Sequence, residues 1–249
     1  MISLKNKTEG ILLKNGEHMS EFLHFRGFPQ KCITFYRNLA DNNNTVWFNS
    51  HRKDFEDFVL APARSFVTEM GKRLLSIAPG INADPRVNHS LFRINRDTRF
   101  SKNKSPYKTN LALWFWEGSG PRLETSGFYV HMEPEMLMLC VGIYRFPKPL
   151  LEKYREYVVH SKHGTTLAKA LDKVMASGPY SIGGGSYKRV PRGYDPSHKY
   201  AALLLHDGLY AGVELAIPGE FFSHEFLDYC FERFNQMHPI HTWLMNLVD

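Results

Sequence analysis

The chain has 249 residues, of which 43% are hydrophobic, 14% aromatic and 22% charged, and its formal net charge is +6. This composition is typical of a globular protein and excludes collagen-like, low-complexity and intrinsically disordered chains. The longest apolar run, at residues 136–144, has nine residues, whereas a membrane-spanning helix needs about 20. With no recognisable secretory signal and three scattered cysteines, we expect a soluble cytoplasmic protein without disulfides.

The N-terminal third predicts a short extension followed by helices. Residues 1–18 are polar and weakly patterned, so we expect a flexible leader or extension there and one domain over residues 19–249. Residues 30–41 carry apolar side chains at three-residue steps, which predicts a helix. The Asn-rich segment that follows ends it and can cap a second helix from Thr45, and Pro62 suits the first turn of a third.

The middle of the chain predicts strands. Residues 91–94 suggest a short one, and residues 110–116 and 127–132 are rich in β-branched and aromatic side chains. The Gly-rich segment between these last two predicts a hairpin. Residues 136–144 then read as a buried strand.

The C-terminal part predicts helices, a long loop and two more strands. Residues 149–159 form one helical face, and Thr165 can cap a further helix. Residues 177–200 are rich in Gly and Pro and predict a loop. Residues 201–215 predict two strands around a His-Asp-Gly turn, and Pro218 introduces a terminal helix. This order predicts an α+β fold with a largely antiparallel sheet packed with helices from both ends of the chain.

No pattern in the sequence predicts a metal or a cofactor, and none names a reaction. The glycines at residues 183–185 are not followed by the Gly-Lys-Ser/Thr of a phosphate loop, and a G-x-S-x-G nucleophile motif is absent. Two pairs of histidines lie three residues apart, but no carboxylate or thiolate completes a metal site beside either pair. These pairs are His160 with His163, and His238 with His241.

One short segment concentrates the positive charge of the chain. Its six basic residues, less Asp97, contribute +5 of the net charge, and they are Arg93, Arg96, Arg99, Lys102, Lys104 and Lys108. A protein that coats nucleic acid usually spreads such residues over a face, so this distribution favours a compact anion site or a structural network of ion pairs. We expect a strand that ends in a basic loop, in which Asp97 stays ionised and orients an arginine.

The same segment carries a family resemblance. "FRINRDTRFSKNKSPYKTNLALWF", residues 92–115, closely resembles the signature of bacterial and fungal proteins grouped as domain of unknown function 2461. Residues 35–56 and 190–210 are similar to the opening and to a later segment of that family, so the likeness runs from about Gly27 to beyond residue 230. It implies one α+β domain in which the basic motif, the Trp47–Phe48 pair and the turn at Gly193 and Tyr194 belong together. It implies no substrate.

We therefore predict a site for a phosphorylated or otherwise anionic ligand, formed by the basic segment with apolar walls and a second edge from the later turn. The predicted ligand-binding residues are Arg93, Arg96, Asp97, Arg99, Lys102, Lys104, Tyr107, Lys108, Trp47, Arg192 and Tyr194.

Three alternatives remain open at this point. The first is an enzyme, a hydrolase or transferase acting on such a ligand, with His131, Tyr107 or Asp195 as base or nucleophile. The second is a nucleic-acid-binding protein, in which the basic loop contacts phosphates. The third is a scaffold protein in which the basic residues only form structural ion pairs. The carboxylates available for such pairs include Glu56, Asp57, Glu117 and Glu124.

Overall fold

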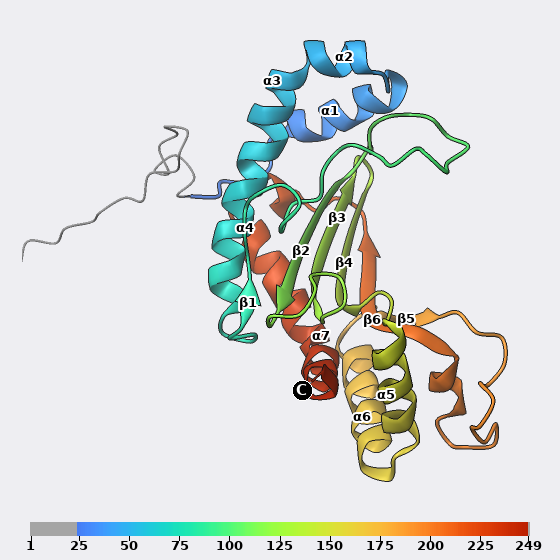
Figure 1. The fold of residues 1–249 in the computed structure, drawn as a ribbon. Coiled ribbons are helices and arrows are strands. Elements are labelled where there is room, and N and C mark those ends of the chain that lie inside the picture. Colours follow the sequence, from blue (N-terminus) through green and yellow to red (C-terminus); the bar gives the residue numbers. More distant parts are fainter. Residues whose placement is uncertain (1–23, 249) are drawn as a thin grey trace, which may run out of the picture.

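The computed structural model describes residues 24–248, which fold into one six-stranded antiparallel sheet with helices packed around it (Figure 1). The predicted α+β class is confirmed, and the expectation for residues 1–18 lies outside the described part. Across the sheet the strands follow the order β1 (Ile81–Asn82), β2 (Leu111–Glu117), β3 (Gly127–Glu133), β4 (Met136–Ile143), β6 (His206–Leu215) and β5 (Ser181–Gly185).

The predicted N-terminal helices are present, and a π-helical turn joins the second helical segment to the third. The chain forms α1 (Gln30–Asp41), α2 (Thr45–Ser50), α3 (Arg52–Phe55), the π-helical turn η2 (Glu56–Leu60) and α4 (Ala61–Leu74). The Asn44 side chain caps α2 by accepting from Trp47 N, as expected of the Asn-rich segment. Pro62 lies in the first turn of α4 as predicted, although α3, η2 and α4 follow one another directly. The wider turn just before Pro62, in which Ala61 N–H donates to Glu56 O, accommodates the proline ring.

The predicted hairpin and central strands are confirmed. β2 pairs with β3 and β3 with β4, each antiparallel and in regular register. Alternation along β2 places Leu113 and Phe115 on one face and Trp114 on the other. The predicted strand at residues 91–94 is reduced to isolated bridges from Leu91 to Leu113 and to Val87.

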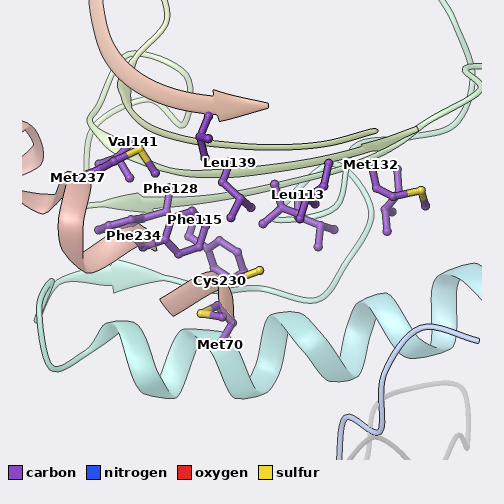
Figure 2. Close-up of a cluster of buried hydrophobic side chains, with 14 of the residues drawn as sticks. Met70, Leu113, Phe115, Phe128, Met132, Leu139, Val141, Cys230, Phe234 and Met237 are labelled. Carbon is purple, nitrogen blue, oxygen red and sulfur yellow. The ribbon is translucent and has the colours of Figure 1, made fainter. Parts of the chain in front are cut away.

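The core lies between one face of the sheet and the helices α4 and α7 (Phe226–Val248). Figure 2 shows Leu113 and Phe115 of β2 and Phe128 of β3 pointing from the sheet toward Met70 of α4 and Phe234 of α7. All five side chains are fully buried. Because two helices cover this face, the side chains that alternate with the core residues are left on the opposite face of the sheet.

The predictions for residues 177–215 are partly wrong. Residues 201–205 form the 3-10 helix η3 (Ala201–Leu205) instead of a strand, and the predicted His-Asp-Gly turn lies inside β6. Gly208 is needed there for close packing, because a Cβ at this position would lie 2.0 Å from Tyr144 O. The segment predicted as loop contains β5, in which Gly183 lies against the Tyr210 ring of β6.

The remaining helices are α5 (Lys148–Val159), α6 (Ser161–Ser177) and the 3-10 turn η4 (Gly219–Phe222). Thr165 does not cap α6 as predicted. His160 does so five residues earlier, since its Nδ1 accepts from the backbone N–H groups of Lys162 and His163. Pro218 precedes η4 as expected, although α7 begins only at Phe226. Over residues 24–248, no helix has the length and apolarity to cross a membrane.

Candidate functional site

A pocket of about 610 Å³ lies on the face of the sheet that α4 and α7 leave uncovered. Its floor is formed by side chains of β2, β3, β4 and β6 that alternate with core residues. The residues that line it are Phe92, Trp114, Leu123, Tyr129, His131, Met138, Cys140, Gly142, Tyr144, Arg145 and Tyr210. A volume of this size is within the range of small-molecule sites.

The pocket is hollow because glycines interrupt its floor. In one row across the sheet, Gly127 pairs with Gly142, which pairs with Tyr210, so two neighbouring strands carry no side chain at this level. Aromatic rings form the walls: Phe92 meets Tyr129 edge-on with ring centres 6.2 Å apart. The site can therefore hold a flat or extended apolar group.

A cluster of cations lies at the Phe92 edge of this pocket. The Phe92 ring centre is 5.4 Å from Lys108 Nζ and 4.2 Å from Arg122 Cζ. Nη1 of Arg122 donates to Asn88 O at 2.9 Å, and the Trp114 ring N–H donates to Arg122 O at 2.6 Å. The other two nitrogens of this guanidinium, Nε and Nη2, are buried without any hydrogen-bond partner. Both nitrogens are buried, so an anion can bind them only if neighbouring side chains move.

In the described part of the chain these cations form no ion pair, although the charge of Arg93 helps to lower the pKa of the Asp97 carboxyl. Throughout residues 24–248, no acidic group forms an ion pair with Arg93, Lys108 or Arg122. Burial lowers the pKa of the Lys108 ammonium, and the nearby charges of Arg93 and Arg122 lower it further. Burial also lowers the pKa of Arg122. Two partly buried cations, Lys108 and Arg122, thus lie close to the exposed Arg93, and this repulsion is unfavourable unless an anion joins them.

A hydrogen-bonded row of polar groups follows β3 into the same pocket. The Glu133 carboxylate accepts from His131 Nε2 at 3.1 Å, which places the proton of a neutral imidazole on that nitrogen. Nδ1 is then the acceptor, and it receives the Tyr129 hydroxyl at 3.1 Å and the Asn110 amide at 3.5 Å. Burial, with a smaller contribution from Cys140 and Glu133, raises the pKa of Tyr129 to about 12. The hydroxyl therefore stays protonated.

The predicted basic residues divide into two groups. Arg93 and Lys108 lie near the pocket edge, whereas the loop tip is closed on itself. There Arg99 binds Asp97 through two hydrogen bonds of 3.0 and 2.7 Å, which confirms the orienting role predicted for that aspartate. The hydrogen bonds from Arg99 lower the pKa of the Asp97 carboxyl and outweigh the smaller opposing effect of desolvation.

The other basic residues of the tip bind backbone carbonyls or remain exposed. Lys104 Nζ donates to Thr98 O at 2.9 Å and Arg96 Nη1 to Ser105 O at 3.2 Å. Lys102 is exposed. The tip therefore offers fewer free donors than its sequence suggests.

Neither predicted apolar wall lies in the sheet pocket. Tyr107 is buried in the core, where its ring stacks on Phe48 with centres 4.2 Å apart. Trp47 stacks on His51 at 4.0 Å, in a separate cleft of about 270 Å³ beside α1. Asn43 joins this region to the basic segment by hydrogen bonds to the backbone N–H and C=O of Tyr107.

The later turn does not approach the basic segment. Residues 186–200 lie at the α5 end of the sheet, at the opposite end of the molecule from the basic loop (Figure 1). Burial and the charge of Glu156 on α5 raise the pKa of Tyr194. Arg192 is exposed, and Asp195 accepts from Ser197 N within its own turn. Arg192 and Tyr194 therefore do not form a second edge of the site beside the basic segment.

The carboxylates considered for structural pairing bind elsewhere. Asp57 pairs with Lys53, and Glu117 pairs with His241. Glu117, His241 and Ser126 form a chain like that of a hydrolase, with 2.7 Å between Glu117 Oε2 and Nε2 and 2.8 Å between Nδ1 and Ser126 Oγ. However, Ser126 is 0% and His241 1% exposed, so no substrate can reach the hydroxyl. This chain is a buried structural network.

Sequence reasoning missed Arg122, Phe92 and most of the pocket floor. Arg122 follows a Gly-rich turn and carries no motif, and only its contact with Phe92 connects it to Lys108. Alternation along β2 and β3 was a usable signal, because Trp114 and Tyr129 had to lie opposite the core residues. The described residues hold no cluster of three or more His, Cys, Asp or Glu that could bind a metal ion.

Comparison with known proteins gives a family but no activity. No curated protein is significantly similar to the chain. The family model described as "Conserved hypothetical protein (DUF2461)" matches residues 31–243. This range contains the whole sheet, the basic segment and the pocket. The chain therefore belongs to the DUF2461 family of conserved hypothetical proteins.

Proposed function

We propose that the protein binds an amphipathic anion, whose apolar body occupies the sheet pocket and whose phosphate or carboxylate contacts Arg122, Lys108 and Arg93. One observation carries this proposal: two nitrogens of the Arg122 guanidinium are buried without a partner beside a second cation at the pocket edge. A buried donor without a partner costs about 1–3 kcal/mol, so a ligand oxygen at this place would recover that cost.

The chemistry of the cations favours an oxyanion. Nε and Nη2 of a guanidinium form the fork that binds a carboxylate or phosphate through two parallel hydrogen bonds. Lys108 adds a mobile point charge on the same side of the site, and Phe92 holds both cations near its ring. The ligand chemistry shared by these groups is an oxyanion attached to an apolar group.

The pocket walls favour an aromatic or acyl group as the apolar part. Trp114, Tyr129 and Tyr210 present rings to the cavity, and Met138 supplies a flexible thioether. A nucleic-acid strand would need an extended basic groove, whereas the free cations here converge on one point. A cytoplasmic location stays a prediction that rests on the three free cysteines, of which Cys32 and Cys230 are buried.

The test measures displacement of anilinonaphthalene sulfonate, a fluorescent amphipathic anion, by a panel of aryl phosphates, fatty carboxylates, mononucleotides and short oligonucleotides. Arg122→Gln should weaken binding by about 10–150-fold, the equivalent of about 1.5–3 kcal/mol for a hydrogen bond to a charged group. Arg99→Gln, at the loop tip, is the matched control and should leave affinity unchanged. Equal losses in both variants, or binding of oligonucleotides alone, would contradict the proposal.

A further inference from the structure

We infer that His131 is the general base of an esterase site in this pocket, acting on a carboxylic ester that carries the anionic group. This inference rests on the proposed function, because the cations near Phe92 would hold the substrate. Tyr129 and His131 both line the pocket. Lys108 precedes Asn110, whose amide donates to His131, and its ammonium lies beside the ring of Phe92 at the pocket edge. The anion-binding edge and the polar row of β3 therefore face one ligand.

Glu133 gives His131 the tautomer that a base requires. The carboxylate can only accept, so it fixes the proton on Nε2 and makes Nδ1 the unprotonated nitrogen, which can take a proton once it exchanges its present donors for water. The His131 side chain is 17% exposed, whereas Glu133 is 49% exposed. The imidazole is thus largely enclosed by the pocket while its partner remains hydrated, which allows it to stabilise an imidazolium cation.

Two hydrogen-bond donors lie beside the same nitrogen. The Tyr129 hydroxyl and the Asn110 amide both point at Nδ1 in the resting state, at 3.1 and 3.5 Å. When Nδ1 takes a proton, it can no longer accept from them, so both donors become available to a developing negative charge nearby. This is the arrangement of an oxyanion hole built from side chains.

Two side chains that could act as nucleophiles, Cys140 and Ser126, are unsuited to attacking the ester. Cys140 lies next to Tyr129 on the pocket floor, but burial raises the pKa of its thiol to about 12, so the thiolate is scarce at neutral pH. Ser126 has a histidine and a carboxylate in sequence, yet it is fully buried against α7. Of these groups only His131 combines a carboxylate partner with access to a cavity.

The reaction needs water as its only co-reactant. Nδ1 of His131 removes a proton from water, and the water oxygen attacks the carbonyl carbon of the ester. The carbonyl electron pair moves to its oxygen, which accepts hydrogen bonds from Tyr129 and Asn110. The tetrahedral intermediate then expels the alcohol, whose oxygen receives the proton from Nδ1. One ester and one water give one carboxylic acid and one alcohol, and the histidine is neutral again.

The experiment uses the full chain and nitrophenyl esters of succinic, adipic and suberic acid, which keep one free carboxylate, with the neutral nitrophenyl hexanoate as control substrate. The anionic esters should be hydrolysed faster than the neutral one, and kcat should rise with pH through one ionisation. His131→Gln should lower kcat by about 100-fold or more with KM changed by less than about twofold. Tyr129→Phe should lower kcat by about 100-fold. His224→Gln, on the surface, should change neither constant.

Separate outcomes distinguish this inference from the proposed function. If wild-type protein binds anilinonaphthalene sulfonate but hydrolyses no anionic ester faster than buffer, the esterase inference fails while the binding site stands. If His131→Gln retains wild-type turnover, His131 is not the base and the inference fails. If neither binding nor hydrolysis occurs, both are wrong. Melting temperatures and probe affinity of each variant show whether it is folded and still binds.

Discussion

Replacing Lys108 by methionine should stabilise the free protein and weaken its binding of anions. Met keeps most of the length of the lysine side chain and removes the ammonium, which is half-buried, lies among Arg93 and Arg122, and has no carboxylate partner. Single stabilising changes, including optimisation of surface charge, commonly raise stability by about 0.5–2 kcal/mol. We use the lower part of this range, about 0.5–1 kcal/mol, because the group is partly solvated. The melting temperature should then rise by about 1–4 °C.

The same variant should lose about 1.5–3 kcal/mol of ligand binding, or about 10–150-fold in Kd, because one charge-assisted hydrogen bond disappears. Urea denaturation gives the free energy of unfolding, and displacement of anilinonaphthalene sulfonate gives the affinity. Lys102→Met removes an exposed ammonium from the loop tip and should change neither quantity. A Lys108→Met protein that is less stable than wild type, with unchanged affinity, would refute the reasoning. Lys108 would then be a structural cation.

Three further predictions concern the buried network, the sheet and the pocket thiol. Burial lowers the pKa of His241 despite its hydrogen bond to Glu117, so the unfolded chain binds a proton at this histidine more readily than the folded protein does. The free energy of unfolding should therefore fall as the pH falls below about 6.5. Urea titrations at pH about 7.5 and 5.5 test this. Glu117→Ala should cost about 1–3 kcal/mol by leaving the His241 donor unpaired, and Glu117→Gln should cost less, as measured by thermal unfolding. Gly142→Ala should lower the free energy of unfolding by more than about 3 kcal/mol, because φ is +139° and a Cβ would lie 2.3 Å from a carbonyl oxygen of β6. Gly219→Ala is the control: a Cβ there meets nothing within 4 Å, so the same assay should show no change. Cys140 should react slowly with a disulfide reagent in native protein and more slowly still with the anionic probe bound; equal rates with and without probe would place the thiol outside the ligand site.

The candidate site was only partly predictable. The concentration of charge in residues 93–108 pointed to an anion site, and Lys108 does lie at the pocket edge. The sequence could not show that Arg99 would be neutralised by Asp97, because two residues in a loop meet only if the backbone turns between them. Nor could it show that Arg122, fourteen positions from Lys108, would share a ring with it.

Local patterning determined much of the fold from sequence alone. Three-residue apolar steps produced α1, and alternating β-branched and aromatic residues around a Gly-rich turn produced the β2–β3 hairpin. These signals work because helix and strand periods are properties of a few consecutive residues. The prediction of a turn at Gly208 was wrong, because this glycine lies inside a strand and allows close packing. A glycine is required there because Tyr144 O of a neighbouring segment leaves no room for a Cβ.

Tertiary structure alone decided which face of the sheet became core and which became pocket. Alternation separates two sets of side chains on each strand, but on β2 both sets are apolar or aromatic, so hydrophobicity does not choose between them there. Docking of α4 and α7 on one face makes that choice and leaves Trp114, Tyr129 and His131 on the other. The physical reason is that burial depends on contacts between segments far apart in the chain, whereas the sequence pattern records only which residues share a face.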